Sequence, residues 1–293
     1  MKRILAIVLV LCLSVACLAG CGAKETDEVK DEKKENDVKG VKVIDINLSD
    51  EEYAFGVDKT QPELLEKVNA FIAEIKANGV FDEICNKYFG DGTPTPVTSY
   101  AQDDSKDQLV VATNAAFEPF EYTAGDKYLG IDMEIADALA KYLGKELVVA
   151  NMDFDAVCLS VGQQKCDIAM AGLTIKPARK EYVTFTDSYY SASQKLICLK
   201  SCTEFDSCKT KEDVEAILNS KDASCKIGVQ NGTTGQLYVN GDEESGFTGF
   251  KATSIGYKNG SLAVQDLLNG NSSYVIIDSA PAACITKSIN AMQ

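Results

Sequence analysis

The sequence predicts an α/β protein made of two lobes with a ligand cleft between them. After Leu109, short apolar strands alternate with amphipathic helices, and the same alternation begins again at Lys195. This alternation is typical of α/β domains with largely parallel sheets, and 293 residues are enough for two cores. Ligands of such folds bind at the carboxyl ends of the strands, so polar residues that follow strands are the candidate site residues.

The composition excludes several classes of protein. The net charge is −15 at pH 7, whereas a nucleic-acid partner requires a basic surface, so none is expected. The chain has no His and no Cys-x-x-Cys pair, so we predict no metal site and no cofactor. An even number of cysteines follows residue 40, which permits disulfides. One disulfide between residues 198 and 225 and free buried thiols are both compatible with the sequence.

The first 40 residues predict export and membrane attachment. Residues 1–20 have a basic start and an apolar stretch, and they end before Cys21 in a pattern typical of a bacterial lipoprotein signal peptide. We expect a lipid on Cys21, with an ordinary signal peptide as the alternative. Residues 21–40 are nearly all polar or charged and cannot bury enough apolar surface to fold. We therefore expect a disordered charged tether, or alternatively a charged helix, and an extracytoplasmic protein anchored to the membrane by its lipid.

Residues 41–91 predict two short strands and two helices. The strands cover residues 41–48, which alternate between apolar and polar, and residues 51–57. Pro62 suits the first turn of a helix, Asn78 and Gly79 suit its end, and a second helix covers residues 81–88. The apolar stripe of the first helix comprises Leu65, Val68, Phe71, Ile72 and Ile75. Residues 92–108, rich in Pro, Thr, Ser and Asp, are expected to be a linker.

Two series of strands and helices follow the linker. In the first series the strands are residues 109–113, 146–150 and 166–172, and the helices are residues 130–144 and a segment that ends near 163. In the second series the strands are residues 195–200, 226–230 and 274–278, and the helices are residues 211–219, 261–268 and a segment from Pro281 onward.

Several stretches together carry a family resemblance. They are ATNAAFEPFEY (112–122), AGLTIKPARKEYVTFTDSYY (171–190), IGVQNGTTG (227–235) and VIIDSAPA (275–282). With the Cys21 motif, they make residues 41–293 similar to the extracytoplasmic solute-binding proteins of polar amino-acid ABC importers. The resemblance implies the two-lobe periplasmic-binding-protein fold of type 2. It also implies a monomer that binds a free amino acid, closes at a hinge and delivers the ligand to an ABC permease and ATPase complex without chemistry.

The order of the segments departs from the family. Residues 41–91 resemble the segment that ends other members, so the chain is interpreted as a circular permutation; a truncated tandem gene is the alternative. The expected division is 41–91 as part of lobe 1, 92–108 as linker, 109–192 as the rest of lobe 1 and 193–293 as lobe 2. We then expect one covalent connection between the lobes, near Tyr190–Gln194. The second connection would persist only through non-covalent pairing of residues 41–48.

The resemblance also implies the ligand-binding residues. Arg179 matches the family's carboxylate-binding arginine, and a guanidinium suits a carboxylate because it donates two parallel hydrogen bonds. Thr174, Gly172 and Asp278 match positions that hold the charged ends of the ligand; taken alone, Asp278 is better explained as a helix cap. The remaining matches are Thr234 and Thr233 for the carboxylate, Phe117 and Phe154 for an aromatic sandwich, and Asn114 for the ligand side chain.

Other functions remain open from the sequence. Some proteins with this fold are dehydratases, but the chain has no His for acid–base work, so we do not expect an enzyme. An ectodomain that senses an amino acid is the other alternative. The acidic composition and Glu118 favour cationic ligands slightly, and the sequence leaves the identity of the amino acid open.

Overall fold

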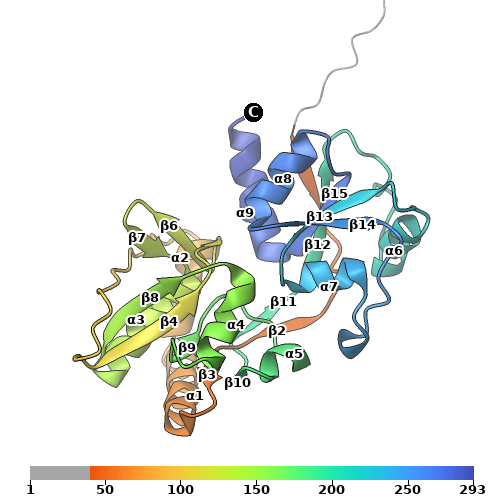
Figure 1. Cartoon of the computed structure of the whole chain (residues 1–293). Coiled ribbons are helices and arrows are strands. Elements are labelled where there is room, and N and C mark those ends of the chain that lie inside the picture. The colour runs from red at the N-terminus through yellow and green to blue at the C-terminus, as the bar shows by residue number, and fades with distance from the viewer. Residues whose placement is uncertain (1–39) are drawn as a thin grey trace, which may run out of the picture. The chain divides into compact units, whose positions relative to one another are not determined.

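The computed structural model describes residues 40–293, shown in Figure 1. The predicted signal peptide and the tether up to residue 39 lie outside the described residues, as does the predicted lipidation of Cys21. Within residues 40–293, no helix is long and apolar enough to span a membrane.

Lobe 1 is built around a five-stranded mixed sheet. Its strands lie in the order β10 (Val183–Phe185), β3 (Gly56–Asp58), β9 (Ile168–Ala169), β4 (Gln108–Thr113) and β8 (Glu146–Asn151). Strand β4 is parallel to both neighbours, whereas β3 is antiparallel to β9 and β10. Alternate residues face opposite sides of a strand, so Val111 packs with α1 (Pro62–Ala77), α2 (Val80–Phe89) and α3 (Ile131–Leu143). Val110 packs on the other side with α4 (Phe154–Gly162).

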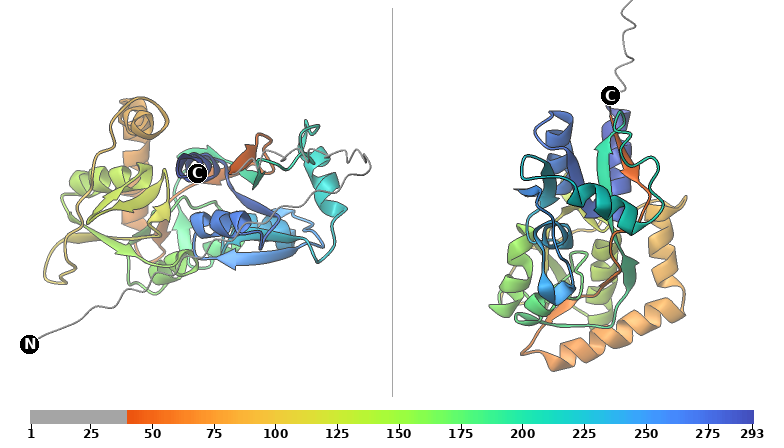
Figure 2. Two further views of the ribbon diagram at one scale, coloured as in Figure 1. Left: turned by 90° about the horizontal axis from the view of Figure 1, so that it is seen from above. Right: turned by 90° about the vertical axis from the view of Figure 1, so that its right-hand side faces the viewer.

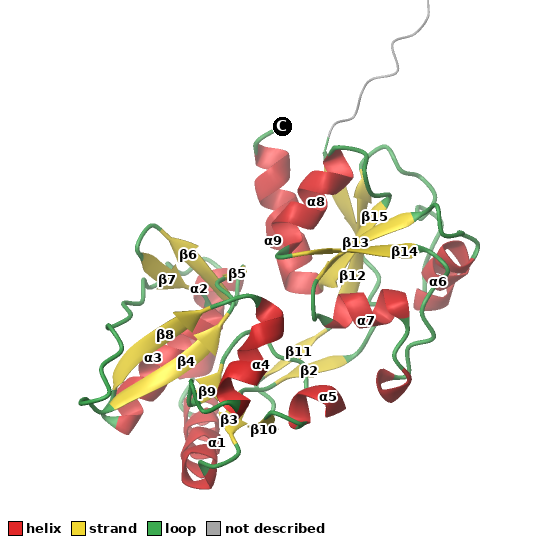
Figure 3. Ribbon diagram, viewed as in Figure 1, coloured by secondary structure: helices red, strands yellow, loops and turns green. Residues whose placement is uncertain are grey.

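Lobe 2 repeats this plan around a second five-stranded sheet. Its order is β1 (Val41–Ile44), β12 (Gln194–Leu199), β15 (Tyr274–Asp278), β13 (Lys226–Gln230) and β14 (Thr253–Tyr257). Val275 and Ile277 pack with α8 (Gly260–Leu268) and α9 (Ser279–Ala291). Ile276 packs on the opposite side with α6 (Lys211–Asn219) and α7 (Thr234–Asn240). Figure 3 shows helices on both faces of each sheet. The α/β prediction is confirmed, although both sheets are mixed rather than largely parallel.

Two segments of chain pass between the lobes. After β1 the chain runs through β2 (Glu51–Tyr53) to β3, and it returns through β11 (Tyr190–Ala192) to β12. Strands β2 and β11 pair with each other in an antiparallel ladder, as Figure 3 shows. The prediction of one covalent connection is therefore wrong. Residues 41–44 also belong to the sheet of lobe 2, not to lobe 1, because β1 pairs along its whole length with β12.

The start of the described chain lies beside its C-terminal helix. The side-chain amide of Asn290 in α9 accepts a hydrogen bond from the Val41 N–H at 3.0 Å and donates one to the Val41 carbonyl at 2.9 Å. Figure 2 shows the C-terminal end of α9 next to the beginning of β1 in both views. The Asn290 side chain thus pairs the free edge of β1 as a further strand would.

The expected linker is attached to lobe 1 at several points, although most of its residues are exposed. Val97 is buried and exchanges backbone hydrogen bonds with Tyr128 in β7 (Lys127–Leu129). The Tyr100 N–H donates to Leu147, and the Ser99 hydroxyl accepts from the Val149 N–H at 2.8 Å. Residues 92–108 therefore form an ordered strap along the edge of β8, held by backbone contacts that their polar composition does not reveal.

Some local predictions need correction. The buried stripe of α1 contains Leu64 in place of Leu65. Residues 51–57 form two strands, β2 and β3, because the chain changes lobe between them. The β5 (Ala116–Phe117), β6 (Glu121–Ala124) and β7 hairpin, the short α5 (Pro177–Lys180) and β14 are additional elements. The eight cysteines of the described chain are all free thiols: Cys85, Cys158, Cys166, Cys198, Cys202, Cys208, Cys225 and Cys284.

Candidate functional site

Arg179 lies in α5 and is held from two sides. Its guanidinium donates hydrogen bonds to the Thr174 carbonyl at 2.8 Å and to the Gly232 carbonyl at 3.1 Å. It also lies over the Phe154 ring, 5.1 Å from the centroid. Arg179 forms no ion pair with any carboxylate of residues 40–293. A guanidinium has five N–H donors, so this positioned cation retains donors for an anion.

Thr174 and Thr234 meet across the two lobes. The Thr234 hydroxyl, in the first residue of α7, donates to the Thr174 hydroxyl at 3.2 Å. The Thr174 hydroxyl in turn donates to the Glu51 carboxylate at 2.6 Å. Both threonines are buried. Thr233 is buried too, but its hydroxyl is committed to the Gln230 carbonyl at 2.8 Å.

Asp278 is a buried carboxylate and not a helix cap. It occupies the N-cap position of α9, yet its side chain makes no capping hydrogen bond. Instead it accepts a hydrogen bond from the Tyr53 hydroxyl at 2.5 Å. Burial, followed by the nearby Glu51 carboxylate, raises the pKa of Asp278 to about 7. An ammonium group placed here would restore its ionised form.

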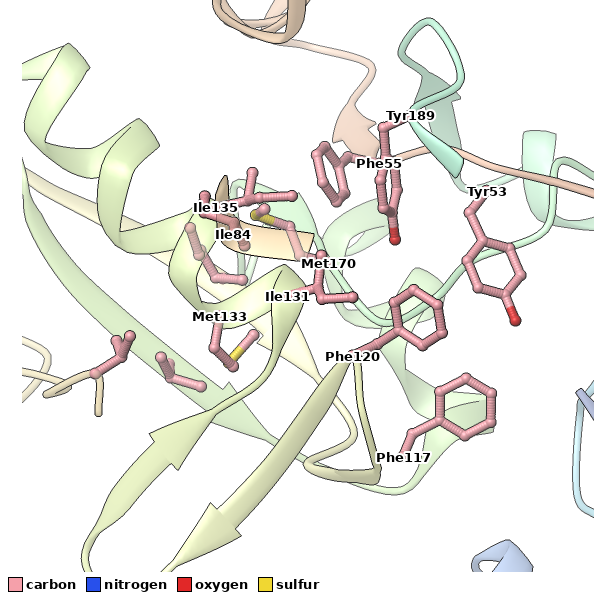
Figure 4. Packing of buried hydrophobic residues seen from close by; sticks show 14 of the residues in the cluster. Tyr53, Phe55, Ile84, Phe117, Phe120, Ile131, Met133, Ile135, Met170 and Tyr189 are labelled. Atoms are coloured by element: carbon pink, nitrogen blue, oxygen red, sulfur yellow. The ribbon is translucent and has the colours of Figure 1, made fainter. Parts of the chain in front are cut away.

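Gly172 lies next to one of the two predicted phenylalanines. Gly172 has a φ of +53°, and its N–H donates to Asp132 at 2.9 Å. A Cβ on Gly172 would lie 2.9 Å from the Phe117 ring. Phe117 packs on Phe120, with centroids 6.1 Å apart, and Figure 4 shows both rings beside Tyr53 at one side of the lobe 1 core. Phe117 thus lies by Gly172, whereas Phe154 lies by Arg179.

Asn114 connects the lobes through its amide. Its NH₂ group donates to the Met152 carbonyl at 2.6 Å, and its oxygen accepts from the Gln230 side chain at 3.0 Å. Both side chains are buried. Asn114 of lobe 1 therefore contacts lobe 2 through the side chain of Gln230. Gln230 ends β13, four residues before Thr234.

Unpartnered polar atoms are buried around these residues. Both carboxylate oxygens of Glu121 and the amide oxygens of Gln194 and Gln230 are buried without a hydrogen-bond partner among residues 40–293. Burial, with the neighbouring Asp132 and Asp278 carboxylates, raises the pKa of Glu121 well above its ordinary value. Since buried polar groups are normally paired, these oxygens are available to accept hydrogen bonds from a molecule that binds there.

Sequence reasoning missed Glu51, Tyr53, Glu121 and Gln194. Glu121 lies in the stretch ATNAAFEPFEY, which carries part of the family resemblance. Gln194 is the first residue of β12 and pairs with Asp278, the last residue of β15. Glu51 is one of two adjacent glutamates, and only pairing in the β2–β11 ladder decides which one is buried. Glu51 and Thr174 also line a cavity of about 500 Å³, bounded elsewhere by Lys176 and Phe247.

Comparison with known sequences places residues 109–269 in a family. They match the bacterial extracellular solute-binding proteins, family 3. One similar protein is the arginine-binding extracellular protein ArtP of Bacillus subtilis (strain 168), which is 38% identical over 98 residues. These residues make up 33% of this chain and 38% of ArtP. Another is the ABC transporter arginine-binding protein 1 of Escherichia coli (strain K12), 29% identical over 175 residues, or 59% of this chain and 64% of that protein. The matched region thus spans less than two thirds of these relatives.

Solved structures agree with this assignment. The ancestral amino acid-binding protein AncCDT-1, a precursor of cyclohexadienyl dehydratase, matches with a TM-score of 0.53 and 32% identity, covering 62% of this chain and 74% of that one. An ancestral arginine-binding protein bound to arginine matches with a TM-score of 0.53 and 31% identity, covering 62% and 75%. The family match spans more than half of the chain, and its fold and sequence agree: the chain belongs to the bacterial extracellular solute-binding proteins, family 3.

Proposed function

We propose that this protein binds a free amino acid outside the cytoplasmic membrane and delivers it to an ABC permease, without chemistry. One observation carries the proposal: an anion-binding group and ammonium-binding groups converge where the two lobes meet. Arg179 and the Thr234 hydroxyl both contact Thr174 and would bind the carboxylate, and the buried Asp278 would bind the ammonium. An amino acid presents both charges, and each would otherwise be costly to bury.

We expect a cationic side chain on the ligand. Asp278, Asp132 and Glu121 are buried, and the pKa of each is raised, chiefly by burial. A guanidinium or ammonium near them would favour their ionised forms. The printed names of similar proteins, which include arginine-binding and histidine-binding proteins, support the same class.

The test is thermal unfolding of the chain from Gly22 onward with each proteinogenic amino acid and ornithine. A ligand that binds only the folded state raises the melting temperature. Arginine, lysine or ornithine is expected to raise it, and Arg179→Ala is expected to abolish the shift. Recovery of the ligand with unchanged mass would support binding without chemistry. The absence of a shift with every amino acid would contradict the proposal.

The attachment and the chain order are proposed together with this function. A lipid on Cys21 would hold a monomeric body at the membrane through residues 22–40. We also propose that the chain is a circular permutation of the family order. The contact of Asn290 with Val41 supports this, because it brings together two segments that are consecutive in other members.

A further inference from the structure

Glu51 lies where the two lobes are connected. It is the first residue of β2, the strand that carries the chain from lobe 2 to lobe 1, and it pairs with Ala192 of the returning strand β11. Its side chain is buried, whereas that of the adjacent Glu52 is exposed. The ladder therefore turns one acidic side chain of this connection into the interior.

Its carboxylate collects hydrogen bonds from both lobes. One oxygen accepts from the Ser49 hydroxyl at 2.7 Å and from the Gln194 side-chain amide at 2.9 Å. The other accepts from the Thr174 hydroxyl at 2.6 Å. Gln194 begins a strand of lobe 2, and Thr174 belongs to lobe 1. One side chain thus links the site residues of both lobes to the connecting strands.

The negative charge of Glu51 has neutral hydrogen-bonding partners only. It forms no ion pair among residues 40–293. The nearby Lys176 ammonium attracts Glu51 without contacting it, since it donates to the Ser245 hydroxyl at 2.8 Å, so the carboxylate has no charged hydrogen-bonding partner. Asp278 lies near Glu51: the two are joined through Gln194, which donates to Glu51 and pairs with Asp278, and the Glu51 carboxylate helps to raise the pKa of Asp278. The buried amide oxygen of Gln194, next to both, has no partner. Two carboxylates and this oxygen form a set of acceptors that one ammonium group would satisfy.

We propose that Glu51 binds the α-ammonium group of the ligand together with Asp278, and so couples ligand binding to the strands that connect the lobes. This rests on the proposed function. A hydroxyl has one proton to donate, and the Thr174 hydroxyl donates it to Glu51. When the ligand ammonium donates to Glu51 instead, the Thr174 proton becomes available to the ligand carboxylate. One exchange of hydrogen bonds would then serve both charged ends of the ligand.

The experiment compares two ligands that differ only in the α-amino group. Calorimetry measures the Kd of L-arginine and of 5-guanidinopentanoate, the same molecule without that group, for the wild-type chain and Glu51→Gln. We expect Glu51→Gln to weaken L-arginine binding by about tenfold or more, the effect of losing one charge-assisted hydrogen bond. The Kd of 5-guanidinopentanoate is expected to change by less than about threefold. Glu52→Gln, an exposed change on the same strand, is expected to alter neither Kd.

The outcomes separate this proposal from the function on which it rests. Equal weakening of both ligands would mean that Glu51 only supports the fold of the connection, and would overturn the proposal. If the wild-type protein binds no amino acid, the proposed function fails. If it binds L-arginine and Arg179→Ala binds it equally well, the function stands but Arg179 does not hold the ligand carboxylate. If Glu51→Gln does not fold, Glu51→Asp is measured with the same two ligands. It must then also weaken L-arginine binding selectively, or the proposal fails.

Discussion

At the scale of single residues, Asp278 makes the stability of the protein depend on pH. Its pKa is raised from 3.8 to about 7, so between these values the folded state binds more protons than the unfolded state. Stability from this group is complete below about pH 4 and is lost as the pH rises toward 7, by about 1.4 kcal/mol per pH unit within that range.

Asp278→Asn tests this linkage. The variant lacks the buried acid, so its unfolding free energy is expected to fall less steeply between pH 4.5 and pH 7, and to exceed that of the wild type at pH 7.5. Urea unfolding at several pH values measures both. Ligand binding is expected to be lost, since the amide cannot neutralise an ammonium. If the unfolding free energies of the two proteins change with pH in the same way, Asp278 does not titrate in the folded state as described.

Gly172 has both a strained backbone and a close neighbour. Its φ of +53° disfavours any side chain, and a Cβ would lie 2.9 Å from the Phe117 ring. Gly172→Ala is therefore expected to destabilise the fold by about 1–2 kcal/mol, measured by chemical denaturation. Gly125→Ala is the matched control, because Gly125 has a φ of +65° but nothing within 4 Å of its added Cβ. A cost no larger than that of the control would rule out the contact with Phe117 as a cause.

At the scale of elements, one side chain joins α9 to the edge of β1. Asn290 satisfies both polar groups of the Val41 backbone, and Val41 is fully buried. Asn290→Ala leaves these groups without partners, so we expect a loss of about 1–3 kcal/mol in the unfolding free energy. Asn269→Ala, at the exposed end of α8, is expected to cost less. If both changes lower the unfolding free energy equally, the hydrogen bonds between Asn290 and Val41 do not stabilise the fold.

At the scale of the whole molecule, we expect the fold to tolerate a change in the order of its segments along the chain. A variant in which a short flexible segment joins Gln293 to Val41, with new ends opened within residues 92–107, keeps both sheets and both connections between the lobes. Because folding depends on packing rather than on where the ends lie, we expect it to fold and to bind the same ligand within about threefold of the original Kd. Circular dichroism and calorimetry measure these two properties. A relinked chain that folds but no longer binds would show that the present order is needed for the site.

Much of this architecture follows from local pattern. Apolar strands followed by amphipathic helices have periods of about two and 3.6 residues, so the alternation that begins at Leu109 predicts two α/β bodies without further information. The family resemblance, rather than local pattern, assigned Arg179, Thr174, Asp278 and Thr234 to the ligand site. The structure brings three of them together: Arg179 donates to the Thr174 carbonyl, and the Thr234 hydroxyl donates to the Thr174 hydroxyl.

The remaining features depend on which segments meet in space. No local feature of residues 41–44 predicts that they pair with Cys198 and its neighbours rather than with lobe 1. The backbone of a strand can form its hydrogen bonds at any open sheet edge. The polar strap of residues 92–108 is ordered by contacts with Tyr128 and Leu147. Glu51 becomes an interior acid only because β2 pairs with β11, and a shift of one residue would have buried Glu52 instead. The pattern of the sequence therefore determines the elements, because it depends on neighbouring residues. The tertiary structure decides the connection between the lobes and the burial of Glu51, because both depend on the pairing of strands that are far apart in the sequence.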